Sequence, residues 1–212
     1  MDLKNKRIVF LGDSITEGYG TSSETKVYHQ LLKERFNLSL ACNCGIGGTR
    51  IAMLKQPTYE ISRCDLYFAL RAQVMPKDAD IVVVFGGTND YGCENGVDIG
   101  DPFSTDNYTF NGALNNLITQ LKTDYINSSI VMLTPLHRTN ENASINGTGY
   151  ILKDYADAII AATKRHNIHL IDLFNKIKLD PYDENLVPDG LHPNDDGHII
   201  IAEFLGKELT KL

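Results

Sequence analysis

Short apolar runs rich in β-branched residues recur along the chain, and longer segments with helical periodicity separate them. Four clear strands are predicted at residues 7–11, 80–85, 130–133 and 168–171. A weaker strand is predicted at residues 38–42, either at an edge of the sheet or as its second strand. The clear runs are almost continuously apolar, which is typical of strands that are covered on both faces. Strands alternating with helices favour a parallel sheet joined by right-handed crossovers.

The segments between the strands carry apolar residues at helical spacing. Helices are predicted at residues 26–35, 65–72, 112–125, 150–165 and 195–212. In the first of them, Val27, Leu31 and Leu32 share one face, as expected for a helix that packs on a sheet. The sequence therefore predicts one α/β domain over residues 1–212, a flavodoxin-like three-layer α/β/α sandwich with a central parallel sheet of about five strands.

The charge and hydropathy of the chain limit its partners. The 212 residues carry a formal net charge of -7, which disfavours nucleic acid and anionic membranes as standing partners because both attract basic patches. The first apolar run is too short for a signal peptide, and no later run approaches membrane-spanning length. We therefore expect a cytoplasmic protein that acts on a small molecule without stable membrane association.

The sequence shows no pattern typical of a metal or cofactor site. The spacing of His192 and His198 matches no metal-hydrolase motif, although a metal hydrolase using them is an alternative. The glycine spacing of a dinucleotide site is missing as well. Irregular spacing indicates buried reduced thiols at Cys42, Cys44, Cys64 and Cys93. We expect no cofactor and no metal.

Polar motifs follow the predicted strands at their carboxyl ends, where open α/β sheets bind ligands. Gly12-Asp13-Ser14 comes directly after the first strand, so the Ser14 hydroxyl can stand at this edge. An isolated Asp-Ser pair is more often a helix cap or a turn, so the remaining motifs decide between these interpretations.

Two further motifs can donate hydrogen bonds to a developing negative charge. A glycine-rich turn at residues 43–49 follows the weak strand, and one of its backbone N–H groups can point at an oxyanion. Asn89 follows the strand at 80–85 and carries two amide donors. Each motif alone is also typical of an ordinary turn.

A carboxylate and an imidazole share one tight turn, Asp189-Gly190-Leu191-His192-Pro193. Pro193 restricts His192 to extended backbone angles, and Gly190 lets the chain bend so that Asp189 reaches one ring nitrogen. A hydroxyl, an imidazole and a carboxylate are the parts of a nucleophilic hydrolase. The alternative is a non-catalytic flavodoxin-like binding module whose Ser14 turn holds an anion.

In this order along the chain, the four motifs resemble the blocks of the SGNH hydrolase family, the GDSL esterases and lipases. The resemblance spans residues 12–193 and implies an acyl-enzyme mechanism. It implies that Ser14 is the nucleophile, His192 the general base and Asp189 the residue that orients the imidazole. It further implies an oxyanion hole formed by the N–H groups of Ser14 and Gly48 and the side chain of Asn89.

The family spacing Asn-x-x-x-x-Gly runs from Asn43 to Gly48, and Gly47 is the alternative donor in the same turn. The two candidate donors are neighbours in the chain. Which of their N–H groups points at the oxyanion therefore depends on the conformation of the turn.

Two long polar loops, residues 91–108 and 134–149, follow strand ends and are expected to form walls of a substrate pocket, with plain mobile loops as the alternative. Their polarity and the absence of tryptophan favour a short acyl group on a polar or carbohydrate-like alcohol. The resemblance leaves a lysophospholipase or acyl-thioesterase activity as the alternative. Candidate substrate-binding residues are Asp13, Tyr91, His137 and Arg138.

Overall fold

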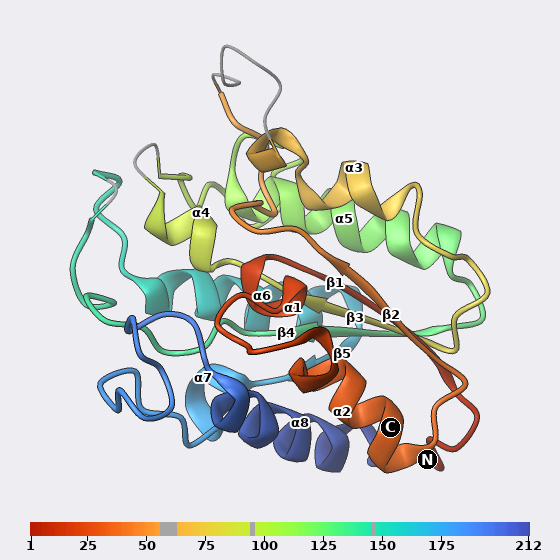
Figure 1. The fold of residues 1–212 in the computed structure, drawn as a ribbon. Coiled ribbons are helices and arrows are strands. Elements are labelled where there is room, and N and C mark those ends of the chain that lie inside the picture. The colour runs from red at the N-terminus through yellow and green to blue at the C-terminus, as the bar shows by residue number, and fades with distance from the viewer. Residues whose placement is uncertain (56–62, 94–95, 146) are drawn as a thin grey trace.

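The computed structural model describes residues 1–55, 63–93, 96–145 and 147–212 (Figure 1). Residues 94–95 and 146 of the two predicted polar loops, and the side chain of Cys64, lie outside the described part. The side chains of Cys42, Cys44 and Cys93 are only partly buried, whereas the sequence predicts buried thiols. In the part of the chain that is described, no helix has the length and apolar character needed to cross a membrane.

Five parallel strands form one sheet with the order β2-β1-β3-β4-β5. The strands are β1 (Arg7–Gly12), β2 (Leu40–Gly45), β3 (Ile81–Phe85), β4 (Ser129–Leu133) and β5 (His169–Ile171). This is the flavodoxin-like order, and it confirms the predicted fold class with the weak strand at one edge. The register decides where the site lies, because Gly12 pairs with Gly45 on one side and with Phe85 on the other. The three strands therefore end at the same edge of the sheet, and the segments that follow them begin side by side there.

Strand β2 differs most from its prediction, running from Leu40 to Gly45 instead of over residues 38–42. Its apolar content falls after Cys42, so hydropathy alone places its end too early. Backbone pairing with β1 continues to Gly45, and this pairing sets the strand.

Helices cover both faces of the sheet (Figure 1). One face carries α2 (Tyr28–Phe36) and α8 (Asp195–Leu209), and the other carries α3 (Phe68–Ala72), α5 (Phe110–Asp124) and α6 (Leu152–His166). Three short helices follow strands, namely α1 (Ser14–Glu17), α4 (Thr88–Gly92) and α7 (Leu173–Lys176). The described residues also form two 3-10 turns, η1 (Glu24–Lys26) and η2 (Arg63–Asp65). The predicted helices at 65–72 and 195–212 are both shorter in the structure, beginning at Phe68 and ending at Leu209 respectively.

The core explains the continuous apolar runs of the central strands. In β1, Val9 and Leu11 pack into the layer of α3, α5 and α6, whereas Ile8 and Phe10 pack into the layer of α2 and α8. All four side chains are fully buried. Because successive side chains point to opposite faces, a strand covered by helices on both sides needs apolar residues at every position.

Candidate active site

Ser14, His192 and Asp189 lie in one chain of hydrogen bonds. Ser14 begins α1 directly after β1, and its Oγ lies 2.9 Å from Nε2 of His192. The other ring nitrogen, Nδ1, lies 2.6 Å from Oδ2 of Asp189. Partial burial raises the pKa of Asp189, but the hydrogen bonds from His192 and Leu191 outweigh it and the net shift is downward. A charged carboxylate therefore stands behind the imidazole.

The turn that carries His192 is held at both ends. Gly190 has φ +74°, in the left-handed region that favours glycine, and a Cβ there would lie 2.5 Å from Cγ2 of Thr139. Its carbonyl accepts the N–H of Thr139 at 2.9 Å, which joins the turn to the loop 134–149. On the far side, Asn194 caps α8 and accepts the N–H groups of Asp196 and Gly197 at 3.1 Å each.

Helix α1 packs tightly against the ends of β1 and β2. A Cβ at Gly12 would lie 2.0 Å from Oγ1 of Thr16, and one at Gly45 would lie 2.2 Å from the backbone nitrogen of Glu17. Glycine is therefore required at both strand ends to seat the helix that presents Ser14. As the first residue of the helix, Ser14 also offers a backbone N–H without an intrahelical acceptor.

The glycine turn after β2 lies against Ser14, and its two candidate N–H donors are not equivalent. A Cβ at Gly47 would lie 3.5 Å from Cβ of Ser14, and the Gly47 N–H donates to Oε2 of Glu17 at 2.7 Å. Gly48 has φ +77°, and its N–H donates to no acceptor within the described residues. Of the two, the Gly48 N–H is the one left available for an anion.

Asn89 comes from the third strand end, as the second residue of α4. Its Nδ2 donates to the carbonyl of Thr49 at 2.9 Å, so the amide is tied to the residue that follows Gly48. This bond uses one of the two amide hydrogens. Ser14, Gly48 and Asn89 thus reach the same edge of the sheet from the ends of β1, β2 and β3.

The comparison with known families agrees with this arrangement. A model of the GDSL-like lipase/acylhydrolase family matches residues 10–200. The chain belongs to this family. The resemblance expected from the sequence is thereby confirmed, and the coarse function is that of a hydrolase of the ester type.

Solved structures with the same fold cover nearly the whole of this GDSL-family chain. A protein from Lactobacillus plantarum is 32% identical with a TM-score of 0.83, and the match covers 98% of each chain. The lipase/acylhydrolase from Enterococcus faecalis is 22% identical with a TM-score of 0.68, covering 96% of this chain and 95% of that one. A member of the lipolytic protein G-D-S-L family from Veillonella parvula is 16% identical with a TM-score of 0.61, covering 97% and 99%. A search among curated proteins returns no match.

Arg71 supports the site of this GDSL-family protein, and the sequence analysis missed it. The side chain is 6% exposed, and its guanidinium donates to the carbonyls of Gly12 at 2.9 Å and Cys44 at 2.5 Å and to Oγ1 of Thr49 at 2.8 Å. Burial lowers the pKa of Arg71 to about 10. One buried cation thus joins two strand ends to the glycine turn. The sequence feature that could have revealed a buried role for Arg71 is its position three residues after Phe68, on the apolar face of a helix.

Asp90 is a second buried support that the sequence analysis did not single out. Its two carboxylate oxygens accept the N–H groups of Ile51 at 3.1 Å and Ala52 at 2.9 Å, and the side chain is fully buried. Burial raises the pKa of Asp90 to about 6. Because Asp90 adjoins Asn89, these bonds hold the segment after the glycine turn at a set distance from the amide donor.

Two of the predicted substrate-binding residues are buried away from solvent. Asp13 caps α1 by accepting the Ile15 N–H at 3.1 Å, and burial raises its pKa to about 7. The ring of Tyr91 is fully buried, and its hydroxyl donates to the carbonyls of Asn140 at 2.5 Å and Ala143 at 2.8 Å. The structure therefore does not bring Tyr91 to the site: α4 turns its ring into the core, where it anchors the loop 134–149.

His137 and Arg138 lie in that loop and are engaged by neighbouring residues. Nδ1 of His137 lies 2.8 Å from Oε2 of Glu141, and its ring packs on Phe174 with the centroids 4.2 Å apart. The guanidinium of Arg138 donates to Oγ1 of Thr88 at 3.2 Å, next to Asn89. His137 is thus held outside the Ser14 hydrogen-bond chain, whereas Arg138 contacts the first residue of α4.

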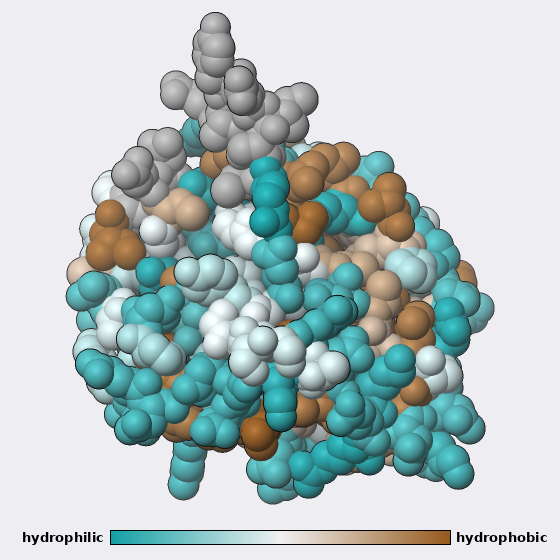
Figure 2. Space-filling model, in the orientation of Figure 1, coloured by the Kyte–Doolittle hydropathy of each residue, from teal (hydrophilic) through white to brown (hydrophobic). Residues whose placement is uncertain are grey.

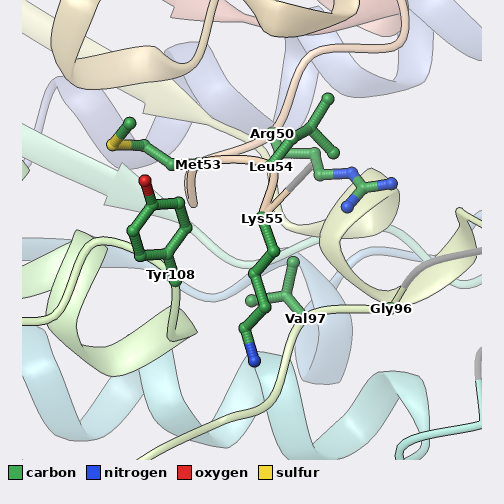
Figure 3. Close-up of a pocket in the computed structure, with 7 residues that line it drawn as sticks. All are labelled: Arg50, Met53, Leu54, Lys55, Gly96, Val97 and Tyr108. Atoms are coloured by element: carbon green, nitrogen blue, oxygen red, sulfur yellow. The ribbon is translucent and has the colours of Figure 1, made fainter. Parts of the chain in front are cut away.

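A cavity of about 220 Å³ lies between the segment after the glycine turn and the first polar loop (Figure 3). Its described lining is Arg50, Met53, Leu54, Lys55, Gly96, Val97 and Tyr108. Arg50 directly follows Thr49, and the Val97 N–H donates to the carbonyl of Asp90 at 3.1 Å. The cavity therefore adjoins the segments that hold Gly48 and Asn89. Among the described residues, no group of His, Cys, Asp and Glu side chains is arranged to hold a metal ion.

Proposed function

We propose that this GDSL-family protein is a serine ester hydrolase that works through an acyl-enzyme. The hydrogen-bond chain from Ser14 Oγ to His192 Nε2 at 2.9 Å, and from His192 Nδ1 to Asp189 at 2.6 Å, carries the proposal. A serine hydroxyl is a weak nucleophile until an adjacent base takes its proton. Asp189 holds the imidazole in the orientation that aims Nε2 at the hydroxyl and stabilises the imidazolium that forms.

In the proposed reaction, His192 takes the Ser14 proton while Oγ attacks the ester carbonyl carbon. The negative charge on the carbonyl oxygen is met by the N–H groups of Ser14 and Gly48 and by the Asn89 amide. His192 then gives its proton to the departing alcohol oxygen as the carbon–oxygen bond breaks. Water, deprotonated by the same imidazole, attacks the acyl-enzyme, releases the acid and restores Ser14.

We place the substrate class at a short acyl group on a polar or carbohydrate-like alcohol. Two observations support this. The surface over α1 and the turn after it is hydrophilic to neutral (Figure 2), so an alcohol bearing hydroxyl groups matches it better than an alkyl chain. The cavity beside the Gly48 turn, about 220 Å³, suits a small group in size.

The test combines covalent labelling with an ester panel. A fluorophosphonate probe is expected to label the wild type and the control variant Ser23→Ala, which removes an exposed hydroxyl on the same segment, but not Ser14→Ala. Acetyl, butyryl and octanoyl esters of one alcohol, together with acetylated sugars and an acyl thioester, then rank the substrates by kcat/KM. Hydrolysis and labelling retained by Ser14→Ala would refute the mechanism. A preference for the octanoyl ester or the thioester would refute the substrate class.

A further inference from the structure

Tyr19 lies exposed against the imidazole of His192. The ring centroids are 4.4 Å apart at an interplanar angle of 58°, and the tyrosine is 62% exposed. Neither the sequence motifs nor the proposed reaction steps give this residue a role. It is nevertheless an aromatic face in direct contact with the residue proposed to move the proton.

The backbone holds Tyr19 in place. The residues on either side, Gly18 and Gly20, have φ +107° and +94°, and the Tyr19 N–H donates to the Ser14 carbonyl at 2.9 Å. A Cβ at Gly20 would lie 2.6 Å from the carbonyl oxygen of Pro193 and 3.3 Å from Cβ of His192. The turn is thus packed against the histidine turn at backbone contact, and this packing determines where the tyrosine ring lies.

A second anchor joins the same segment to the element that follows His192. Ser22 donates its backbone N–H to Oδ1 of Asp195 at 2.8 Å and its hydroxyl to Oδ2 at 2.6 Å. Thr21 closes the turn by donating its hydroxyl to the Gly18 carbonyl at 2.7 Å. The ring is therefore presented on a segment tied both to the turn of His192 and to the first residue of α8, which reduces the entropy lost when it contacts a ligand.

The proposed mechanism determines which part of an ester meets this ring. The carbonyl oxygen must face the donors at Gly48 and Asn89. The alcohol oxygen must instead come within hydrogen-bond reach of His192 Nε2, about 2.6–3.2 Å, to receive the proton. The Tyr19 ring, which packs against the same imidazole, therefore flanks the alcohol part of the substrate, not the acyl part.

We propose that Tyr19 is the platform on which the alcohol part of the substrate packs, and that this part is a sugar ring. The inference rests on the proposed function and adds a specificity-determining residue to it. A sugar ring offers an apolar C–H face to the aromatic ring, and its hydroxyl groups can meet polar residues at the rim of that aromatic ring. That rim is polar here: the side chain of Asp189 is 49% exposed beside His192, and Ser22 is exposed along the same segment.

The test compares acetyl esters that differ only in the alcohol: an acetylated methyl pyranoside, phenyl acetate and ethyl acetate. In Tyr19→Ala, kcat/KM for the pyranoside is expected to fall about fivefold to tenfold relative to ethyl acetate, the size of one aromatic contact. Tyr19→Phe keeps the face and is expected to restore most of that ratio. Tyr182→Ala, which removes another exposed tyrosine, is the matched control and is expected to keep the wild-type ratio.

The other outcomes each overturn the inference. An equal loss on all three esters would make Tyr19 a positioning residue for His192, and an unchanged ratio would remove its role. A loss confined to phenyl acetate would make the platform one for aryl alcohols and refute the sugar ring. Labelling by fluorophosphonate separates these from failure of the proposed function, since a wild type that resists the probe refutes the serine mechanism before Tyr19 is tested.

Discussion

His198 lies inside the protein with half of its hydrogen-bonding capacity unused. The side chain is fully buried in α8, and its Nδ1 accepts the Tyr28 N–H at 3.2 Å. Nε2 has no partner among the described residues, and a second buried histidine, His29, lies close enough to disfavour a charge. Burial first, and then His29, lowers the pKa of His198 from 6.5 to about 4. We expect this imidazole to destabilise the fold as the solution becomes acidic.

The sign follows from proton uptake in the two states. The unfolded chain protonates His198 near pH 6.5, whereas the folded chain does so only near 4. Between these values the unfolded state binds more protons, so the free energy of unfolding is intact above the unfolded pKa and falls as the pH falls toward the folded one. At pH ~4.5 the loss is about 2.5 kcal/mol: ~1.4 kcal/mol for each of the ~2 pH units below the ordinary histidine pKa, less ~0.2 kcal/mol because part of the folded state is already protonated there.

Buried carboxylates act in the opposite sense and must be separated from this effect. Burial raises the pKa of Asp13 to about 7 and of Asp90 to about 6, so these groups take up protons on folding and stabilise the fold as the pH falls. A pH curve of the wild type alone would sum both trends. The informative quantity is therefore the difference in unfolding free energy between the wild type and a variant that lacks only the imidazole.

The variant is His198→Asn, because the amide oxygen of asparagine can take the place of Nδ1 and accept the Tyr28 N–H. Urea unfolding followed by far-UV circular dichroism, at pH ~7 and ~4.5, gives each free energy. The wild-type advantage over His198→Asn is expected to shrink by about 2.5 kcal/mol at the lower pH. His169→Asn, which removes an exposed imidazole on β5, is the control and is expected to show no such change. A shrinkage below about 1 kcal/mol would refute the argument from burial.

Three further outcomes are expected. Asn89→Ala removes one proposed oxyanion donor and should lower kcat about 10²–10³-fold with little change in KM; a pure KM effect in steady-state kinetics would contradict this role. Arg71→Lys replaces a fork of donors with a single ammonium that cannot reach Gly12, Cys44 and the glycine turn together, so urea unfolding should show a loss of about 2–4 kcal/mol, and an unchanged midpoint would refute the link. Asp90→Asn sets an amide NH₂ against a backbone N–H and should cost about 1–3 kcal/mol by the same assay; a stability equal to wild type would show that one acceptor suffices.

The fold could be predicted from the sequence because its determinants are local. Apolar runs such as the one in β1, and the helical faces beside them, specify a doubly covered parallel sheet through side-chain direction alone. The end of β2 could not be predicted in this way, since its last residues, Asn43 to Gly45, are held by pairing with β1. The strand that pairs with β2 is distant in sequence, and the hydropathy of a segment does not indicate which strand pairs with it.

The sequence by itself determined the chemistry at the strand ends. Ser14 and Asn89 follow strands directly, and Asp189 and His192 share one turn, so short-range order alone places each group. Only the tertiary structure decided which groups meet. It engages the Gly47 N–H with Glu17, turns Tyr91 into the core, and sets Arg71 and Tyr19 beside the site. The physical reason is that these contacts join residues far apart along the chain, and packing of the whole sandwich determines their geometry.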